Sequence, residues 1–218
     1  MITKSIALAL VGLFYSWASN SESPAEIASR VQSRYQSLKS MKVTFAQTYE
    51  ANGIRQEESG ILWILKPGRM RWEYAVPERK IFLVDGKNSY FYVPAENQVS
   101  SRKLTQEDIR YTAFGFLLDQ SSLEKDFQAE IIPAEGPIPK DHRALKLVPK
   151  HSLENVAYIL LGLHPENLEI SVIVVRELSG ADNSFAFSNL EENPTLKESL
   201  FELKIPKGTE VLSLDVSP

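Results

Sequence analysis

The sequence predicts an α+β protein in which one antiparallel sheet carries helices at two points. An amphipathic helical pattern comes first, over residues 24–39. Aromatic-rich stretches with strand-like alternation follow from residue 41, and a second helical pattern interrupts them at residues 105–118. The 218 residues are 43% hydrophobic and 24% charged. This composition suits one domain with a substantial core, and not a disordered chain.

Charge and cysteine usage exclude several classes of protein. The chain has 24 Lys and Arg against 28 Asp and Glu, a net charge of −4. Because no basic tract is long enough to follow a phosphate backbone, we expect no nucleic-acid partner. The chain has no cysteine, which excludes disulfides, cysteine metal sites and the acylated cysteine of a lipoprotein.

The first residues are typical of a secretory signal peptide. Lys4 precedes an uncharged apolar run over residues 6–15, and small residues come just before a cleavage site after Ala18. The alternative, a membrane anchor, needs about 20 apolar residues, more than this run supplies. We therefore expect residues 1–18 to be removed and residues 19–218 to form a single soluble domain, free in the periplasm.

A helix is expected directly after this segment. Ser23 is a suitable N-cap and Pro24 a suitable first helical residue. Over about four turns, apolar residues then recur at helical spacing, so one face should lie on an apolar surface. These residues are Ile27, Val31, Tyr35 and Leu38.

The first strands are expected over residues 41–50 and 60–65, followed by a turn at Pro67-Gly68. Residues 69–74 then give the clearest alternation in the chain, with Met70, Trp72 and Tyr74 on one face. Residues 80–84 and 89–93 should form a hairpin around a turn at Asp85-Gly86, and residues 99–104 a further strand.

After the expected helix at 105–118 and a short turn at 121–124, strands resume. A loop with three prolines separates the first two of them, at residues 133–139. The expected strands are 128–132, 144–148, 156–163, 168–177, 183–190 and 200–205.

Motifs for catalysis and nucleotide binding are missing: there is no G-x-S-x-G, no G-x-G-x-x-G, no Gly-rich phosphate loop and no H-E-x-x-H. His142, His151 and His164 follow or precede prolines and are interpreted as surface residues with no metal. Asp85 is interpreted as a turn residue. The sequence therefore disfavours an enzyme without excluding one.

The run from Gly60 to Tyr74, GILWILKPGRMRWEY, is distinctive together with its spacing to Pro77, Val84-Asp-Gly-Lys87 and Tyr90-Phe-Tyr-Val-Pro94. With FAQ at 45–47, LVPK at 147–150 and FELKIPKG at 201–208, it resembles the periplasmic outer-membrane lipoprotein carrier family, the LolA type. The resemblance covers nearly all of residues 19–218.

The resemblance implies an unclosed antiparallel half-barrel of about eleven strands, whose apolar concave face is covered by a helical lid. It implies a carrier that takes triacylated lipoproteins from an inner-membrane ABC transporter and gives them to an outer-membrane acceptor. Such a carrier uses no ATP or cofactor, and we expect a monomer. An acidic mature chain also avoids anionic membranes, as a shuttle should.

Within this fold, the face of Met70, Trp72 and Tyr74 is expected to be the concave lipid-binding face. The same residues could instead be an ordinary core between sheet and helix. Expected neighbours from the sheet are Phe45, Trp63 and either Tyr90 or Tyr92, and expected lid residues are Phe114, Phe116 and Leu117.

Lys66 stands where the family typically has an arginine that holds the lid shut through backbone carbonyls. Lysine keeps the charge but lacks the planar fork of five donors. Lys66 is therefore either a partial lid latch, with Arg69 or Arg71 as substitutes, or a solvated residue at a strand end.

Two other functions are alternatives for this sequence. One is a periplasmic sensor of lipids or lipoproteins with the same scaffold, which usually carries an additional domain. The other is a lipid hydrolase, which needs a nucleophile and a base that the sequence does not reveal.

Overall fold

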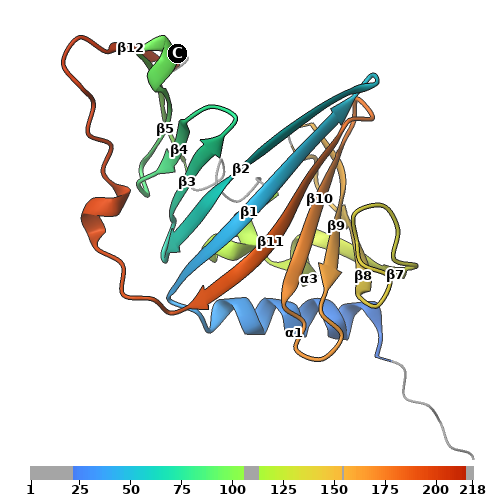
Figure 1. Cartoon of the computed structure of the whole chain (residues 1–218). Helices are drawn as coiled ribbons and strands as arrows, with labels where there is room; N and C mark the ends of the chain where they lie inside the picture. The colour runs from blue at the N-terminus through green and yellow to red at the C-terminus, as the bar shows by residue number, and fades with distance from the viewer. Residues whose placement is uncertain (1–21, 106–112, 154, 215–218) are drawn as a thin grey trace, which may run out of the picture.

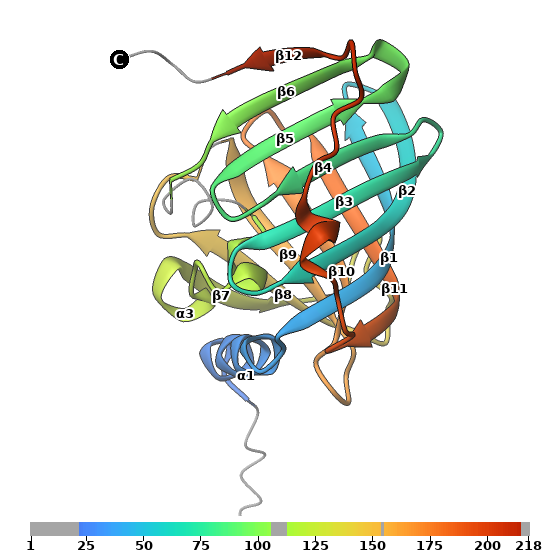
Figure 2. The same ribbon diagram turned by 90° about the vertical axis from the view of Figure 1, so that its left-hand side faces the viewer.

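The computed structural model describes residues 22–105, 113–153 and 155–214, and the expected signal peptide at residues 1–18 lies outside them. One twelve-stranded sheet has the order β12-β6-β5-β4-β3-β2-β1-β11-β10-β9-β8-β7. It curls into a half-barrel without closing, so that β12 and β7 are its two edges (Figures 1 and 2). No helix among the described residues is both long and apolar enough to cross a bilayer.

Most strands agree closely with the ranges expected from the sequence, but the second begins at Ile54 and not Gly60, and the last, Glu210–Ser213, was not expected. The first six are β1 (Ser40–Ala51), β2 (Ile54–Leu65), β3 (Arg69–Val76), β4 (Lys80–Val84), β5 (Asn88–Val93) and β6 (Gln98–Lys103). The others are β7 (Phe127–Ile132), β8 (Arg143–Pro149), β9 (Val156–Leu163), β10 (Ile170–Glu177), β11 (Asp182–Glu192) and β12 (Glu210–Ser213).

All neighbouring strands from β1 to β11 pair antiparallel, as expected. The twelfth strand, β12, adds to the edge of β6 in parallel orientation, so the sheet is mixed. This pairing could not be predicted from the sequence, because β12 is four residues long and exposed throughout.

Helix α1 (Pro24–Gln36) begins with a capping box: the Ser23 hydroxyl accepts from the Glu26 amide, and Glu26 accepts from the Ser23 amide. The helix lies across one end of the half-barrel (Figure 1). Its buried stripe of Ile27, Val31 and Tyr35 packs into the main core, so the predicted amphipathic helix is confirmed.

The central insertion differs from the single helix expected at residues 105–118. Residues 106–112 lie outside the described residues. The described end is a 3₁₀ helix, η2 (Gly115–Leu118), and a short helix α3 (Leu123–Asp126) follows it with Ser122 as N-cap. Asp119 has a φ of 58°, so the chain leaves the helical conformation directly after η2.

The strand expected at residues 200–205 is wrong. This part belongs to a C-terminal strap, residues 194–209, that contains the 3₁₀ helix η3 (Glu198–Phe201) and crosses the outer face of β3 and β4 (Figure 2). Strands β3, β4 and β5 are paired on both sides, which leaves no edge for another strand there. Phe201 instead packs in an apolar cluster on that outer face, where it is 2% exposed.

Candidate functional site

The concave face carries a floor of aromatic rings centred on Trp72 of β3. Its ring lies 4.8 Å from that of Phe45 and 5.2 Å from that of Phe185, centroid to centroid, in edge-on and tilted arrangements. Such offset contacts are favourable for aromatic pairs beyond the area they bury. The predicted grouping of Phe45, Met70, Trp72 and Tyr74 on one face is what the register of β1, β2 and β3 produces.

Gly60 of β2 makes this floor possible. It is paired with Phe45 on one side and Tyr74 on the other. Because no side chain stands between them, the two rings meet directly, with centroids 5.0 Å apart. A Cβ at Gly60 would lie 2.0 Å from the Glu73 carbonyl oxygen, so even alanine does not fit without moving backbone.

A cavity of about 1000 Å³ opens over this floor. Its apolar part comes from both halves of the sheet and from the insertion. The principal residues are Met70, Trp72, Tyr74, Phe82, Val84, Phe91, Phe114, Val175 and Phe185. The cavity also has a polar wall, to which β1, β10, β11 and the residues before β9 contribute.

The insertion covers part of the floor as a lid. The Phe114 ring lies 5.2 Å from those of both Trp72 and Phe185 and lines the cavity. Phe116 and Leu117 are fully packed in the core instead, where Phe116 meets the Tyr35 ring edge-on at 6.5 Å. Of the three expected lid residues, therefore, Phe114 touches the cavity and the other two fix η2 to α1.

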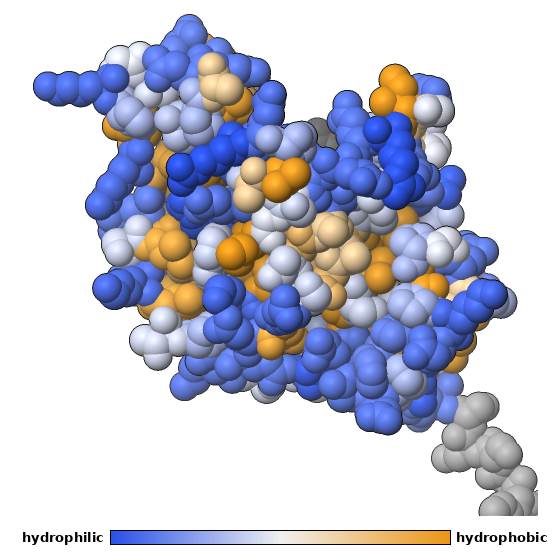
Figure 3. Space-filling model, viewed as in Figure 1, coloured by the Kyte–Doolittle hydropathy of each residue, from blue (hydrophilic) through white to orange (hydrophobic). Residues whose placement is uncertain are grey.

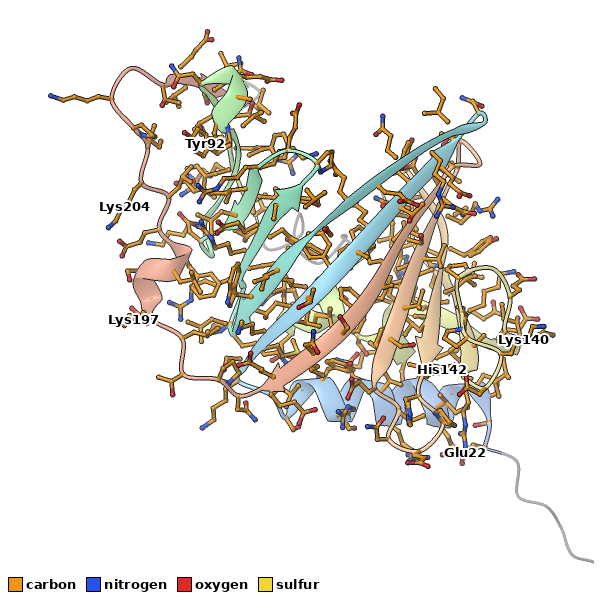
Figure 4. All side chains as sticks on the ribbon, in the orientation of Figure 1. Glu22, Tyr92, Lys140, His142, Lys197 and Lys204 are labelled. Atoms are coloured by element: carbon orange, nitrogen blue, oxygen red, sulfur yellow. The ribbon has the colours of Figure 1, made fainter. Side chains whose placement is uncertain are left out.

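Two expected neighbours of Trp72 lie on the opposite, outer face of the sheet, so this expectation is wrong. Trp63 is paired with Arg71, not Trp72, so its side chain points outward. Trp63 and Tyr92 pack under the strap with Phe201, and Figure 4 shows Tyr92 on the strap side of the sheet. Tyr90 belongs to this outer cluster as well, although it also borders the cavity.

The reason is that residues 61–65 are apolar on both faces. The strap covers the outer face of the sheet at this point, so both faces are apolar. Alternation alone therefore does not tell the cavity face from the face under the strap. The sequence analysis missed Phe82, Phe91 and Phe185, which do line the cavity. The signal was present for Phe82 and Phe91, because the Asp85-Gly86 hairpin places Phe82 beside Trp72 and opposite Phe91.

Lys66 lies between the lid and the sheet. Its ammonium donates to the Tyr35 carbonyl oxygen at 2.5 Å and to Asp119 Oδ1 at 2.9 Å, and its side chain is 7% exposed. Tyr35 is in the last turn of α1 and Asp119 is the C-cap of η2. A cation at a helix C-terminus also suits the helix dipole.

Two tyrosine hydroxyls in this region stay neutral over a wide pH range. Burial raises the pKa of Tyr35 to about 12, and burial also raises the pKa of Tyr74. The Tyr35 hydroxyl accepts a hydrogen bond from the Ile170 amide at 2.9 Å. The floor is therefore apolar and uncharged at physiological pH.

Residues that might suggest chemistry have structural surroundings. Asp85 Oδ1 accepts from the amides of Lys87 and Asn88, which confirms its interpretation as a turn residue. The rings of His142 and His164 lie 5.4 Å apart, and His151 is exposed. Within the described part of the chain, no group of three or more His, Asp or Glu residues could hold a metal ion.

The fold and the cavity define a class: a half-barrel protein whose concave aromatic face can hold an apolar ligand under a small lid. Residues 36–204 match the family described as outer membrane lipoprotein carrier protein LolA. The match spans well over half of the chain, so the chain belongs to this family.

Individual relatives agree. The outer-membrane lipoprotein carrier protein of Chromohalobacter salexigens is 30% identical over 187 residues, covering 85% of this chain and 86% of the relative. That of Nitrosomonas europaea is 28% identical over 187 residues, covering 80% and 88%. A solved structure, an uncharacterized conserved protein from Thermus thermophilus, has a TM-score of 0.54 at 16% identity, covering 86% of this chain and 97% of that chain. At this identity the likeness concerns the fold alone.

Proposed function

We propose that this protein carries lipid-modified proteins across the periplasm. It binds the acyl chains of lipoproteins released from the inner membrane and delivers them to the outer membrane. The observation that carries the proposal is the cavity of about 1000 Å³ with an aromatic floor. Part of this floor is covered by the side chain of Phe114, which belongs to the lid. Family membership favours this function over a regulatory lipid sensor with the same fold.

The physical task suits such a surface. Each CH₂ group of an acyl chain removed from water contributes about 0.8 kcal/mol, so a free lipoprotein cannot cross the aqueous space. A concave floor of rings set at different angles takes chains of different length without a strict shape requirement. The ring of Phe114 occupies the floor in the structure, so cargo has to replace its contacts with Trp72 and Phe185.

The route follows from this binding role. Residues 1–18 direct export, and residues 19–218 act as one carrier domain and as a monomer. A triacylated lipoprotein is received from an inner-membrane ABC transporter and passed to an outer-membrane acceptor. The carrier itself performs no chemical reaction and needs no cofactor, since loading and release are exchanges of apolar contacts.

Lys66 is the lid latch in this proposal. One ammonium group bonds a carbonyl of α1 and a carboxylate of the insertion, so it holds together the two helical parts that cover the floor.

Arg69 and Arg71, the other candidates for a latch, bind the strap and not the lid. Arg69 pairs with Glu198 at 3.2 Å and Arg71 donates to the Leu200 carbonyl at 3.3 Å, both on the strap.

The proposal is tested by native mass spectrometry of the mature protein purified from periplasm, followed by lipid extraction. We expect the wild-type chain to retain a triacylated protein and Trp72→Glu to lose it. Since Trp72 is only 3% exposed, Trp72→Glu could also unfold the sheet. Phe91→Glu is therefore the second variant, because Phe91 lines the same cavity and is 39% exposed.

The matched control is Ala75→Glu, which places the same carboxylate at an exposed position of β3. It should bind cargo like the wild-type chain. An empty wild-type protein that also fails to take up a synthetic triacylated lipopeptide would overturn the carrier function.

A further inference from the structure

The polar wall of the cavity is an organised row of side chains. On β1 and β11, Gln47 Nε2 donates to Asn183 Oδ1 at 2.8 Å. On β10 and just before β9, Asn155 Nδ2 donates to Glu177 Oε2 at 2.8 Å. All four residues line the same cavity as Trp72, so the concave face has an apolar floor and, beside it, a belt of amides with one carboxylate. We call Gln47, Asn155, Glu177 and Asn183 the polar belt.

One atom of the belt has an unmet requirement. Gln47 Oε1 is buried and has no hydrogen-bond partner among the described residues. A buried carbonyl oxygen without a donor is unfavourable, so native proteins rarely keep one without a reason. The other end of the Gln47 amide is already used, since Nε2 donates to Asn183 Oδ1, so Oε1 is the atom left to accept from a ligand.

The position of Gln47 connects it with the lid. Its register partner on β11 is Phe185, and Phe114 of the lid packs on the Phe185 ring with centroids 5.2 Å apart. Displacing Phe114 from the floor therefore frees the side chain that stands directly beside Gln47. The unpaired acceptor lies where the apolar floor meets the polar belt.

We propose that Gln47 accepts a hydrogen bond from the N–H of an N-acylated cysteinyl peptide, and that the polar belt is the subsite for the junction between acyl chains and peptide. This proposal rests on the carrier function proposed above and adds a specificity determinant to it. An acceptor selects a donor, and an amide-linked acyl chain brings an N–H to the point where its hydrocarbon ends.

The same reasoning disfavours other amphiphiles at this wall. The carboxylate of a free fatty acid has no proton to donate at neutral pH, and it would face the Glu177 carboxylate. Arg102 borders the cavity from β6 and is a cation that such a headgroup could approach instead. A carboxylate headgroup should therefore lie on the Arg102 side of the cavity and not at the polar belt.

The experiment uses the mature chain and a matched pair of probes: a tripalmitoylated cysteinyl peptide, and the same peptide N-methylated at its acylated nitrogen. The probes differ in one N–H. We expect the wild-type chain to bind the N–H probe about 3- to 10-fold more tightly, the range of one net hydrogen bond. In Gln47→Met this preference should disappear.

Thr44→Met is the control, since it places the same side chain on the exposed outer face of β1 and should keep the preference. Equal binding of the two probes by the wild-type chain overturns the subsite and leaves the carrier function intact. A loss of affinity for both probes in Gln47→Met also overturns it, because that result indicates packing alone. If neither probe binds the wild-type chain, the carrier function fails, and the subsite with it.

Discussion

At the scale of single residues, Lys66 joins the end of α1 to the insertion through one ammonium group. Arginine would reach several carbonyls with its planar fork. Lysine reaches a carbonyl at the end of α1, and its second acceptor is a carboxylate, that of Asp119. The Lys66 ammonium therefore makes one hydrogen bond to a neutral carbonyl and one ion pair.

Lys66→Leu should loosen the lid. It removes one hydrogen bond and one ion pair that is partly screened by water, so we expect a loss of about 1–2 kcal/mol in unfolding free energy. The more sensitive readout is access to the floor: a fluorescent apolar dye should bind faster to Lys66→Leu than to the wild-type chain.

Lys66→Arg is the matched variant, since it keeps the charge and regains the fork. We expect it to bind the dye no faster than the wild-type chain. If Lys66→Leu leaves dye entry, cargo retention and cargo release unchanged, Lys66 has no latch function and is a strand-end residue only.

From the sequence it was easier to predict which residues are important than on which face of the sheet each side chain lies. The sequence analysis placed Phe45, Met70, Trp72 and Tyr74 together because they alternate on strands joined by short turns. It misplaced Trp63 and Tyr92 because this sheet is covered on both sides, by the lid inside and the strap outside. When a strand is apolar on both faces, its sequence does not tell which face lies under the lid and which lies under the strap.

At the scale of elements, the C-terminal strap acts as an outer clasp on β3, β4 and β5. Phe201 packs with Ile81 and Leu83 in the outer cluster. Beyond it, Asn97 Nδ2 donates to the Gly208 carbonyl at 2.8 Å and guides β12 to the edge of β6. Figure 3 shows the face viewed in Figure 1 as largely hydrophilic, with apolar surface in small patches.

Phe201→Ala should detach the strap while leaving the cavity in place. Truncating a buried phenylalanine costs about 3–5 kcal/mol where it unfolds with the whole protein, and less where a peripheral segment can open locally. We expect the amides of residues 194–209 to exchange faster with deuterium, and those of β1 and β11 to keep their protection.

The control for the strap is Leu203→Ala, because Leu203 is only partly buried in the same cluster. Its effect on exchange should be clearly smaller. Equal exchange in the strap of Phe201→Ala and wild type would mean that the hydrogen bonds from the Arg71 and Asn97 side chains to strap carbonyls hold the strap without the ring.

Element boundaries were predictable where local chemistry sets them, as at the Ser23 capping box and the Asp85 turn. Boundaries that are set only by tertiary contacts could not be predicted. The first half of β2, from Ile54 to Ser59, is polar and mostly exposed, and it is a strand because β1 pairs along its full length. Residues 200–205 have strand-like composition but no free edge to join.

At the scale of the whole molecule, α1 ties together the two halves of an open sheet. Its last turn bonds Lys66, just after β2, through the Tyr35 carbonyl, and β10 through the Tyr35 hydroxyl. Arg34 adds ion pairs to Glu169, at 3.5 Å, and to Glu192. An unclosed barrel has no ladder between its two edge strands, so these bonds add a second connection between the end of β2 and β10, besides the pairing through β1 and β11.

Tyr35→Phe should weaken this tie and change the alkaline limit of stability. Without the hydroxyl, the buried Ile170 amide loses its acceptor, which costs about 1–3 kcal/mol near neutral pH. The pH effect has a definite sign. The ordinary pKa of a tyrosine is 10.0 and burial raises that of Tyr35 to about 12, so the unfolded chain releases this proton first.

The contribution of Tyr35 is therefore fully present below pH 10 and is lost as the pH rises toward 12, by at most about 2–3 kcal/mol. Urea unfolding at pH 7 and at steps from pH 9 to 11 measures it. We expect Tyr35→Phe to be less stable than the wild-type chain at pH 7, and the difference between them to shrink as the pH rises. A difference that stays constant across this range would show that the Tyr35 hydroxyl is not held neutral by burial, and that α1 stabilises the open sheet through its apolar stripe and Lys66 alone.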